Sequence, residues 1–403
     1  MSTPLLRYPQ FDGDWEQVKV GDVSKVTSGG TPNRTNLNYW GGKIPWVTTS
    51  LINFNTINDA EEYITDEGLT NSSAKLFPKG TLLIALYGQG VTRGKVALLG
   101  LEAATNQACA AILFVRSKVD QNFAFFQLMS KYYAIRNLAN DGGQKNLSGG
   151  LIKSLGLALP SIDEQLKIAN FLSSVDRKIS LLKEKLALLL QYKKGVLQKL
   201  FSQEISFKDE SGDEFSDWQE YKLSDVLELT LSPIKMEDES EYELITVRRR
   251  NGGVNSRGFY KGKEVLVKSQ FELKKNQFII SKRQIVHGAC GVVPSDLEGA
   301  IVSNEYNVFD VVPGLLDVHF FNLFSQTKYM RRAYFINSDG VHIEKLLFKT
   351  QSWLKTKVTI PSLSEQKKIV AFVRALDEKL VAINKKIELT QIYKKGLLQQ
   401  MFV

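Results

Sequence analysis

The chain has 403 residues, of which 24% are charged and 43% hydrophobic, and its formal net charge at pH 7 is +9. This length allows roughly two to four domains, and the composition is that of a globular protein rather than a disordered or fibrous one. The sequence offers no apolar run of about 20 residues, no signal peptide and only two distant cysteines, so we expect a cytoplasmic protein that contacts no membrane.

Residues 1–159 are predicted to form a mixed α/β globular domain. Short apolar runs bounded by glycine, proline and asparagine indicate strands, and a longer amphipathic run indicates a helix. The predicted strands cover residues 44–52, 81–88, 95–100 and 108–116, and the predicted helix covers residues 121–138.

Residues 160–202 are predicted to form one long helix. Ser161 with Glu164 three residues later is typical of a capping box, and Pro160 precedes it. The apolar residues then alternate steps of three and four, which indicates a narrow coiled-coil seam, although a long core helix is the simpler alternative. The seam residues are Ile168, Leu172, Val175, Ile179, Leu182, Leu186 and Leu189.

Residues 203–360 are predicted to form a second mixed α/β domain, which opens with an acidic strip. Residues 215–226 resemble residues 11–23, and residues 317–330 resemble residues 120–133, but residues 28–50 have no visible counterpart near 230–250. The predicted strands begin at Tyr242, Gln277, Ala300 and Tyr306, and a helix is predicted over residues 317–336.

Residues 361–403 are predicted to form a second long helix that repeats the first. Residues 361–402 align with residues 160–201 without a gap, and Ser362 with Glu365 repeats the capping box. A domain followed by a long helix therefore occurs twice. We predict an α+β protein with two mixed α/β globular domains, two long antiparallel coiled-coil helices and a pseudo-twofold internal repeat.

A search for catalytic motifs finds none. Residues 87–96 superficially resemble a phosphate-binding loop, but Gln89 stands where the first glycine is required and Val96 replaces the serine or threonine. No amino-methyltransferase motif appears, and the three histidines have no zinc-type spacing with the cysteines. The absence of these motifs agrees with the non-catalytic role that the family resemblance given below implies.

Polar and basic side chains in loops are the candidates for contact with double-stranded DNA, although a loop residue of this kind is more often solvated than in contact with a base. Arginine binds guanine or phosphate, and amides bind adenine. In the first domain the candidates are Thr31, Asn33, Arg34, Thr48, Thr49, Ser50, Tyr87, Gln89, Thr92, Arg93, Lys95, Gln144, Lys145 and Asn146. In the second they are Arg248, Arg249, Arg250, Asn251, Lys261, Lys282, Arg283, Asn304, Arg331 and Arg332.

Both long helices contain the same Tyr-Lys-Lys-Gly sequence near their ends. A solvated helix face, phosphate contact and the docking of a partner protein are the alternatives for it. The candidate partner-binding residues are Tyr192, Lys193, Lys194, Tyr393, Lys394 and Lys395.

The chain resembles the specificity subunits of type I restriction–modification systems over nearly its whole length. The resemblance rests on the repeated P-S-x-x-E-Q…Y-K-K-G-x-L-Q helix, the stretch from Gly29 to Thr48 and the segment Ala104–Ala108. It implies two target-recognition domains that read a split DNA site, with the helices as a ruler. It also implies two methyltransferase subunits and restriction subunits as partners, which would bind S-adenosylmethionine, ATP and magnesium in place of this chain.

The second domain departs from the pattern, because Leu231-Ser232-Pro233 stands where the glycine-rich stretch is expected. Contacts in the first domain should therefore not be copied onto the second. Two other functions stay open from the sequence: a catalytic restriction–methyltransferase fragment, and a coiled-coil adaptor that binds no DNA.

Overall fold

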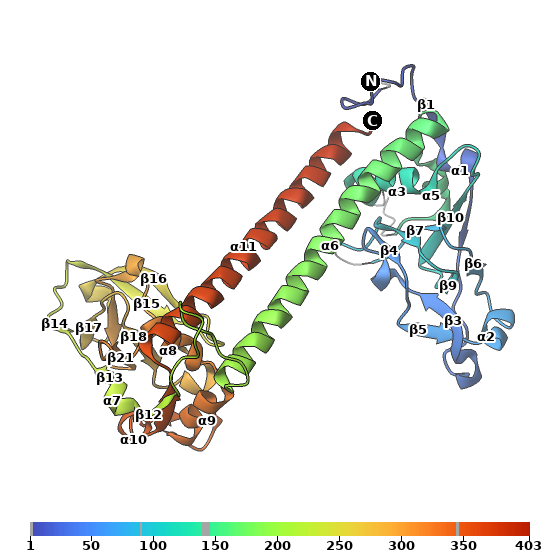
Figure 1. The fold of residues 1–403 in the computed structure, drawn as a ribbon. Helices are drawn as coiled ribbons and strands as arrows, with labels where there is room; N and C mark the ends of the chain where they lie inside the picture. The colour runs from blue at the N-terminus through green and yellow to red at the C-terminus, as the bar shows by residue number, and fades with distance from the viewer. Residues whose placement is uncertain (1–2, 89–90, 139–145, 344–345) are drawn as a thin grey trace. The chain divides into compact units, whose positions relative to one another are not determined.

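The computed structural model describes residues 3–88, 91–138, 146–343 and 346–403 (Figure 1). Its contacts divide the chain into unit 1, Met1–Lys185 with Ile383–Val403, and unit 2, Leu186–Ala382. Two long helices, α6 (Ile162–Phe201) and α11 (Leu363–Gln400), each contribute to both units. The predicted fold class is confirmed, whereas the units differ from the four predicted segments because they share both helices.

Unit 1 consists of two packed sheets, a two-stranded sheet and short helices. Its strands are β1 (Glu16–Lys19), β2 (Ser24–Ser28), β3 (Trp40–Val47), β4 (Asn55–Ile57), β5 (Glu62–Ile64), β6 (Leu76–Phe77), β7 (Leu82–Ala85), β8 (Val96–Leu99), β9 (Ala103–Thr105), β10 (Cys109–Phe114) and β11 (Gly156–Leu159). Its short helices are α1 (Val20–Val23), η1 (Leu37–Tyr39), η2 (Thr49–Leu51), α2 (Asp66–Thr70), α3 (Gln121–Ser130), α4 (Tyr132–Asn137) and α5 (Gly149–Ser154). The sheet orders are β2-β10-β7-β8-β4, β5-β3-β9-β6 and β1-β11.

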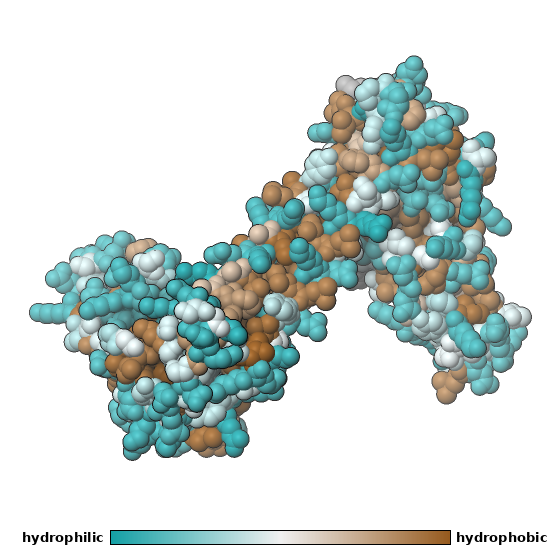
Figure 2. Space-filling model, in the orientation of Figure 1, coloured by the Kyte–Doolittle hydropathy of each residue, from teal (hydrophilic) through white to brown (hydrophobic). Residues whose placement is uncertain are grey.

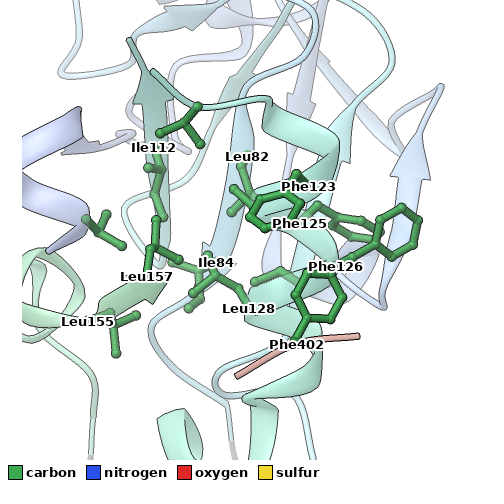
Figure 3. Packing of buried hydrophobic residues seen from close by; sticks show 14 of the residues in the cluster. Leu82, Ile84, Ile112, Phe123, Phe125, Phe126, Leu128, Leu155, Leu157 and Phe402 are labelled. Atoms are coloured by element: carbon green, nitrogen blue, oxygen red, sulfur yellow. The ribbon is translucent and has the colours of Figure 1, made fainter. Parts of the chain in front are cut away.

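The central sheet of unit 1 is buried on both faces. On β7, Leu82 and Ile84 pack toward α3 and the start of α6, whereas Leu83 and Ala85 pack toward the four-stranded sheet. Successive side chains of a strand point to opposite faces, so a strand between two cores must be apolar at every position. This explains the uninterrupted apolar run in the sequence, and Figure 3 shows the helix-facing core with Phe402 against α3.

Unit 2 repeats this architecture. Its strands are β12 (Gln219–Lys222), β13 (Leu227–Leu229), β14 (Pro233–Ile234), β15 (Glu241–Val247), β16 (Val254–Lys261), β17 (Gln270–Glu272), β18 (Phe278–Ser281), β19 (Cys290–Val292), β20 (Ile301–Ser303), β21 (Tyr306–Val311), β22 (Ser338–Asp339), β23 (Leu347–Phe348) and β24 (Lys357–Ile360). Its short helices are α7 (Leu223–Val226), η3 (Gly262–Glu264), η4 (Ile285–His287), η5 (Ser295–Leu297), α8 (Val318–Phe324), α9 (Lys328–Ile336) and α10 (Thr350–Trp353). The sheet orders are β13-β21-β18-β19, β14-β17-β20-β15-β16, β12-β24 and β22-β23.

The strand pairings show that β3 and β15 occupy the same place in their units. β3 lies between β5 and β9, with β9 parallel to it, and β15 lies between β16 and β20, with β20 parallel to it. β15 is therefore the structural counterpart of β3, although residues 28–50 show no similar sequence near residues 230–250. The two sequences can differ because the position of a strand in a sheet determines its backbone pairing and its burial, but not the identity of its residues.

The helices predicted over residues 121–138 and 317–336 are each interrupted. Unit 1 has α3 followed by α4, and unit 2 has α8 followed by α9. The break in unit 2 has a local cause, because the Thr327 hydroxyl accepts a hydrogen bond from the Met330 amide and so begins a new helix. None of the helices in the described ranges is long and apolar enough to cross a membrane.

The predicted capping boxes at the starts of α6 and α11 are half correct. The Ser161 hydroxyl accepts from the Glu164 amide, and the Ser362 hydroxyl accepts from the Glu365 amide, each over 3.4 Å. The Glu164 carboxylate, however, binds Arg7 through two hydrogen bonds of 2.8 Å. A guanidinium with two charged donors binds a carboxylate more strongly than one backbone amide does. This explains why Glu164 binds Arg7 and not the amide at the start of the helix.

The repeated glutamine after each of these glutamates fastens the long helix to its unit. Gln165 accepts from the Asp120 amide and donates to the carbonyls of Lys118 and Pro160. Gln366 makes the same three bonds in unit 2. Because both side chains are buried, all their polar atoms require partners, and the bonds fix the start of α6 beside α3 and the start of α11 beside α8.

Candidate nucleic-acid interface

In unit 2 an arginine-rich turn follows β15. The Arg248 amide donates to the Gly253 carbonyl over 3.0 Å, which closes the turn, while Arg250 and Asn251 adopt left-handed backbone angles with φ of 59° and 55°. Their amides donate to the carbonyls of His287 and Gly288 over 2.7 and 2.9 Å. The turn is thus fixed against a neighbouring loop, and the side chains of Arg248, Arg249 and Arg250 are exposed.

Two further loops meet this turn. The Lys282 amide, after β18, donates to the Glu305 carbonyl, after β20, over 3.0 Å. Arg283 Nε donates to Glu305 Oε2 over 2.7 Å, and Lys282 Nζ donates to the Asn304 carbonyl. Burial raises the pKa of Tyr306, against smaller opposing effects from the Val247 backbone and the Thr246 side chain. We call the set Arg248–Asn251, Lys282, Arg283, Asn304 and Glu305 the unit 2 edge.

In unit 1 the equivalent loops also meet at one edge, but the side chains at this edge are polar and uncharged. The Asn106 amide donates to the Val47 carbonyl over 3.0 Å, which joins the ends of β9 and β3. The hydroxyls of Thr48 and Ser50 are 2.6 Å apart, and the Thr31 hydroxyl hydrogen-bonds Gln107. The Leu86 amide donates to the Ala108 carbonyl, which brings the end of β7 to the same place. We call the set Thr48–Ser50, Tyr87, Asn106 and Gln107 the unit 1 edge.

The loop between β7 and β8 continues from this edge with the remaining basic candidates of unit 1. Lys95 Nζ donates to Asn53 Oδ1 over 2.7 Å and lies 5.7 Å from the Phe54 ring centroid. Thr92 and Arg93 are half-buried. Of the other candidates, Asn146 is exposed, and Gln89, Gln144 and Lys145 lie outside the described residues.

Arg34 is held in an aromatic and ionic cage. Its guanidinium carbon lies 4.0 Å from the Trp40 ring centroid and 4.8 Å from that of Trp46, and it binds both carboxylate oxygens of Glu62. This bond raises the pKa of Arg34 and lowers that of Glu62. Cation–π contact and an ion pair both restrict the side chain, so Arg34 shapes the loop that also carries Thr31 and Asn33.

Several candidates of unit 2 do not belong to its edge. Lys261 pairs with Glu241 across β15 and β16, at the end of β15 opposite Arg248, and its ammonium binds Glu239 over 3.1 Å. Antiparallel pairing therefore separates it from the arginine turn. Arg331 and Arg332 are exposed on α9, which packs against η4 beside that turn.

The repeated lysines of α6 and α11 bind the opposite helix. Within unit 2, Lys193 pairs with Asp377, and within unit 1, Lys394 pairs with Asp176 over 2.6 Å. The second of these lysines also lies 5.3 Å from the ring centroid of Phe126. In the sequence both lysines interrupt the heptad, and the structure supplies an acidic partner for each.

The rest of the repeated Tyr-Lys-Lys-Gly sequence stays available to a partner. Tyr192, Lys194, Tyr393 and Lys395 are exposed. Hydrophobic side chains are also exposed along both helices, as Figure 2 shows; among them are Leu181, Leu188, Leu190, Leu389 and Ile392. A face that combines large apolar side chains with lysines is typical of a protein-binding surface.

Sequence reasoning missed the acidic partners that fix these basic residues, namely Glu62, Glu239, Asp176 and Asp377. Each comes from an element distant in sequence, so no local pattern could have indicated it. Within the described ranges no group of three or more histidine, cysteine or acidic residues could hold a metal ion. Burial raises the pKa of the Cys109 thiol to about 12 and that of Cys290 to about 11.

Residues 12–191 and 215–391 each match the family model of the type I restriction modification DNA specificity domain. The MjaVIII specificity subunit of Methanocaldococcus jannaschii is 23% identical over 94% of this chain and 89% of its own length. The MjaIX specificity subunit of the same organism is 29% identical, and the match spans 54% of this chain and about half (52%) of that relative.

Two solved structures have a similar fold. The S subunit of a type I restriction–modification system from M. genitalium aligns with a TM-score of 0.57 and 18% identity, over 100% of this chain and 99% of that one. The HsdS subunit of Thermoanaerobacter tengcongensis aligns with a TM-score of 0.56 and 14% identity, over 100% and 98%.

Proposed function

Because this chain belongs to the family of type I restriction–modification DNA specificity proteins and carries two copies of the family's domain, we propose that it reads a split DNA site for a methyltransferase and restriction complex. One observation carries the proposal. Each unit brings loops from neighbouring strands to one edge, and the two edges present different side chains. Equivalent scaffolds with unlike edges suit the reading of two different half-sites.

In this proposal each edge contacts bases in a groove of double-stranded DNA, and surrounding cations hold the phosphates. Phosphate contacts give affinity that falls with salt, while base contacts give sequence preference. Arginine suits guanine, and the amides and hydroxyls of the unit 1 edge suit bases that offer both a donor and an acceptor.

The long helices would set the distance between the half-sites. α6 has 40 residues and α11 has 38. At about 1.5 Å per residue each can span roughly 60 Å. The two lysine–aspartate pairs resist sliding of one helix along the other, which supports a ruler of fixed length.

Catalysis would belong to partner subunits. Two methyltransferase subunits would bind along the exposed apolar and lysine-bearing faces of α6 and α11 and bring S-adenosylmethionine. Restriction subunits would bring ATP and magnesium. Target adenines must leave the base stack for methylation, so the edges would hold DNA in a form that the methyltransferase can open. Such a complex would act in the cytoplasm.

The test is to map methylated adenines in cells that express this chain with its methyltransferase. A bipartite motif is expected. A seven-residue insertion at equivalent places in both helices keeps the heptad register and adds about 10 Å, or about three base pairs. The motif's gap should grow by about that number with both half-sites unchanged. Altered half-sites with an unchanged gap would refute the ruler.

The purified chain and its methyltransferase distinguish the two other candidate functions. Methyl transfer by the purified chain alone would indicate a catalytic fragment. Failure to bind duplex DNA, even with the methyltransferase present, would indicate a coiled-coil adaptor.

A further inference from the structure

One ion pair of the unit 2 edge is placed by the backbone rather than by the side chains. Strands β18 and β21 pair antiparallel up to Ser281 and Tyr306, and the next residues continue the contact through the Lys282 amide and the Glu305 carbonyl. Arg283 and Glu305 therefore leave the sheet side by side.

The pair adds little to stability. The side chains of Arg283 and Glu305 are 58% and 48% exposed, and ion pairs this exposed contribute little because water screens them. The nearby backbone bond already joins the two loops. The pair instead orients the guanidinium. Nε donates to Glu305 Oε2 over 2.7 Å, and the two Nη groups at the end of the guanidinium carry donors that this bond does not use.

A guanidinium presented in this way matches a pair of acceptors. Guanine offers such a pair through O6 and N7 in the major groove, and two phosphate oxygens offer another. The neighbouring carboxylate decides between them, because Glu305 would repel a phosphate but can accept a hydrogen bond from the amino group of cytosine. We infer that Arg283, oriented by Glu305, reads a guanine in the half-site bound by unit 2; this rests on the function proposed above.

The unit 1 edge has no such device. Tyr87 follows β7 where Arg283 follows β18, and Asn106 and Gln107 follow β9 where Asn304 and Glu305 follow β20. The guanine contact is therefore specific to the second half-site, and a change at Tyr87 serves as the matched control.

The experiment maps adenine methylation in cells that carry the chain and its methyltransferase, for the wild type and for R283K, R283Q, E305Q and Y87F. We expect R283K to relax one guanine position in one half-site by about 5- to 150-fold, because lysine keeps the charge but not the paired donors. E305Q should relax the same position less, and Y87F should leave it unchanged.

Three results would overturn the inference. The preference for guanine at this position could persist in R283K, as expected if Arg283 only binds phosphate. R283Q would then weaken binding uniformly across sequences and lower the salt slope of DNA binding by about 0.9. The half-site could also be unaffected by all Arg283 and Glu305 variants. Lastly, E305Q could relax a different position. A wild-type chain that yields no bipartite motif would instead refute the proposed function itself.

Discussion

Replacing glutamate by glutamine at the start of each long helix should change the stability of the two units in opposite directions. Glu164 and Glu365 are equivalent in the repeat and are 1% and 2% exposed. Glu164 binds Arg7. In unit 2 Ser206 takes the place of Arg7, because Phe207 packs against Phe372 as Tyr8 packs edge-on against Phe171.

The size of the effect in unit 1 follows from the lost charge. E164Q weakens two hydrogen bonds between charged groups, each 2.8 Å long, and leaves Arg7 to the carbonyls of Asp12 and Gly13. Hydrogen bonds to charged groups contribute about 1.5–3 kcal/mol, so we expect the free energy of unfolding to fall by about that amount. Amide exchange from α3 should become about 10- to 140-fold faster.

In unit 2 the same substitution should raise the free energy of unfolding. Burial raises the pKa of Glu365, and the nearby Glu214 carboxylate raises it further, against an opposing hydrogen bond from Trp218. A folded-state pKa above the unfolded value means that stability present at acidic pH is lost as pH rises through the folded pKa. E365Q keeps an acceptor for Trp218 without the buried charge, so it should stabilise unit 2 at neutral pH and match the wild type near pH 4.

Hydrogen exchange measured by mass spectrometry separates the two units, because α3 reports on unit 1 and α8 on unit 2. The experiment compares both variants with the wild type across pH 4–8. Destabilisation of unit 2 by E365Q at neutral pH, as strong as that of unit 1 by E164Q, would contradict the expected opposite signs. An effect of E365Q that does not change with pH would contradict the role given to the Glu365 charge.

Three further outcomes are expected. R248Q with R250Q should lower the salt slope of DNA binding by about 1.8, or about 0.9 per phosphate contact. K357Q should leave the slope unchanged, because Lys357 lies on β24, outside the unit 2 edge, and already pairs with Glu220 over 2.7 Å. K394A should accelerate amide exchange in unit 1 more than K193A does in unit 2, because Lys394 is the more buried and also contacts Phe126; equal effects would contradict this. Cys109 and Cys290 should resist iodoacetamide at pH 8 until the chain unfolds, since their raised pKa values keep the thiols protonated.

The long helices and the repeat could be predicted because their signals are local and periodic. A heptad records which residues face the partner helix, so Ile168, Leu172 and Val175 are buried as the pattern indicates. From the sequence alone, Lys193 and Lys394 are only candidate partner-binding residues. Their aspartate partners lie on the other helix, and no local pattern contains that information.

The site was harder to predict, because strand order decides which loops meet. The arginine turn and Lys282–Arg283 were identified as candidates, and the sheet brings them to one edge. Lys261 was identified on the same grounds, yet antiparallel pairing carries it to the other end of β15. Arg34 was expected to contact DNA through its charge, a prediction that stands untested, while two tryptophans and Glu62 give it a structural use.

Unit 1 is formed by both ends of the chain, which affects how it folds during synthesis on the ribosome. Its core joins Phe123 and Ile168 to Leu397, Met401 and Phe402, so residues separated by more than half the chain must both exist before the core closes. At about 5–20 residues per second, some 200 residues between Lys185 and Val403 take about 10–40 s. During that interval the part of α3 that Phe402 covers stays exposed on the nascent chain, and exposed apolar surface of this kind favours aggregation.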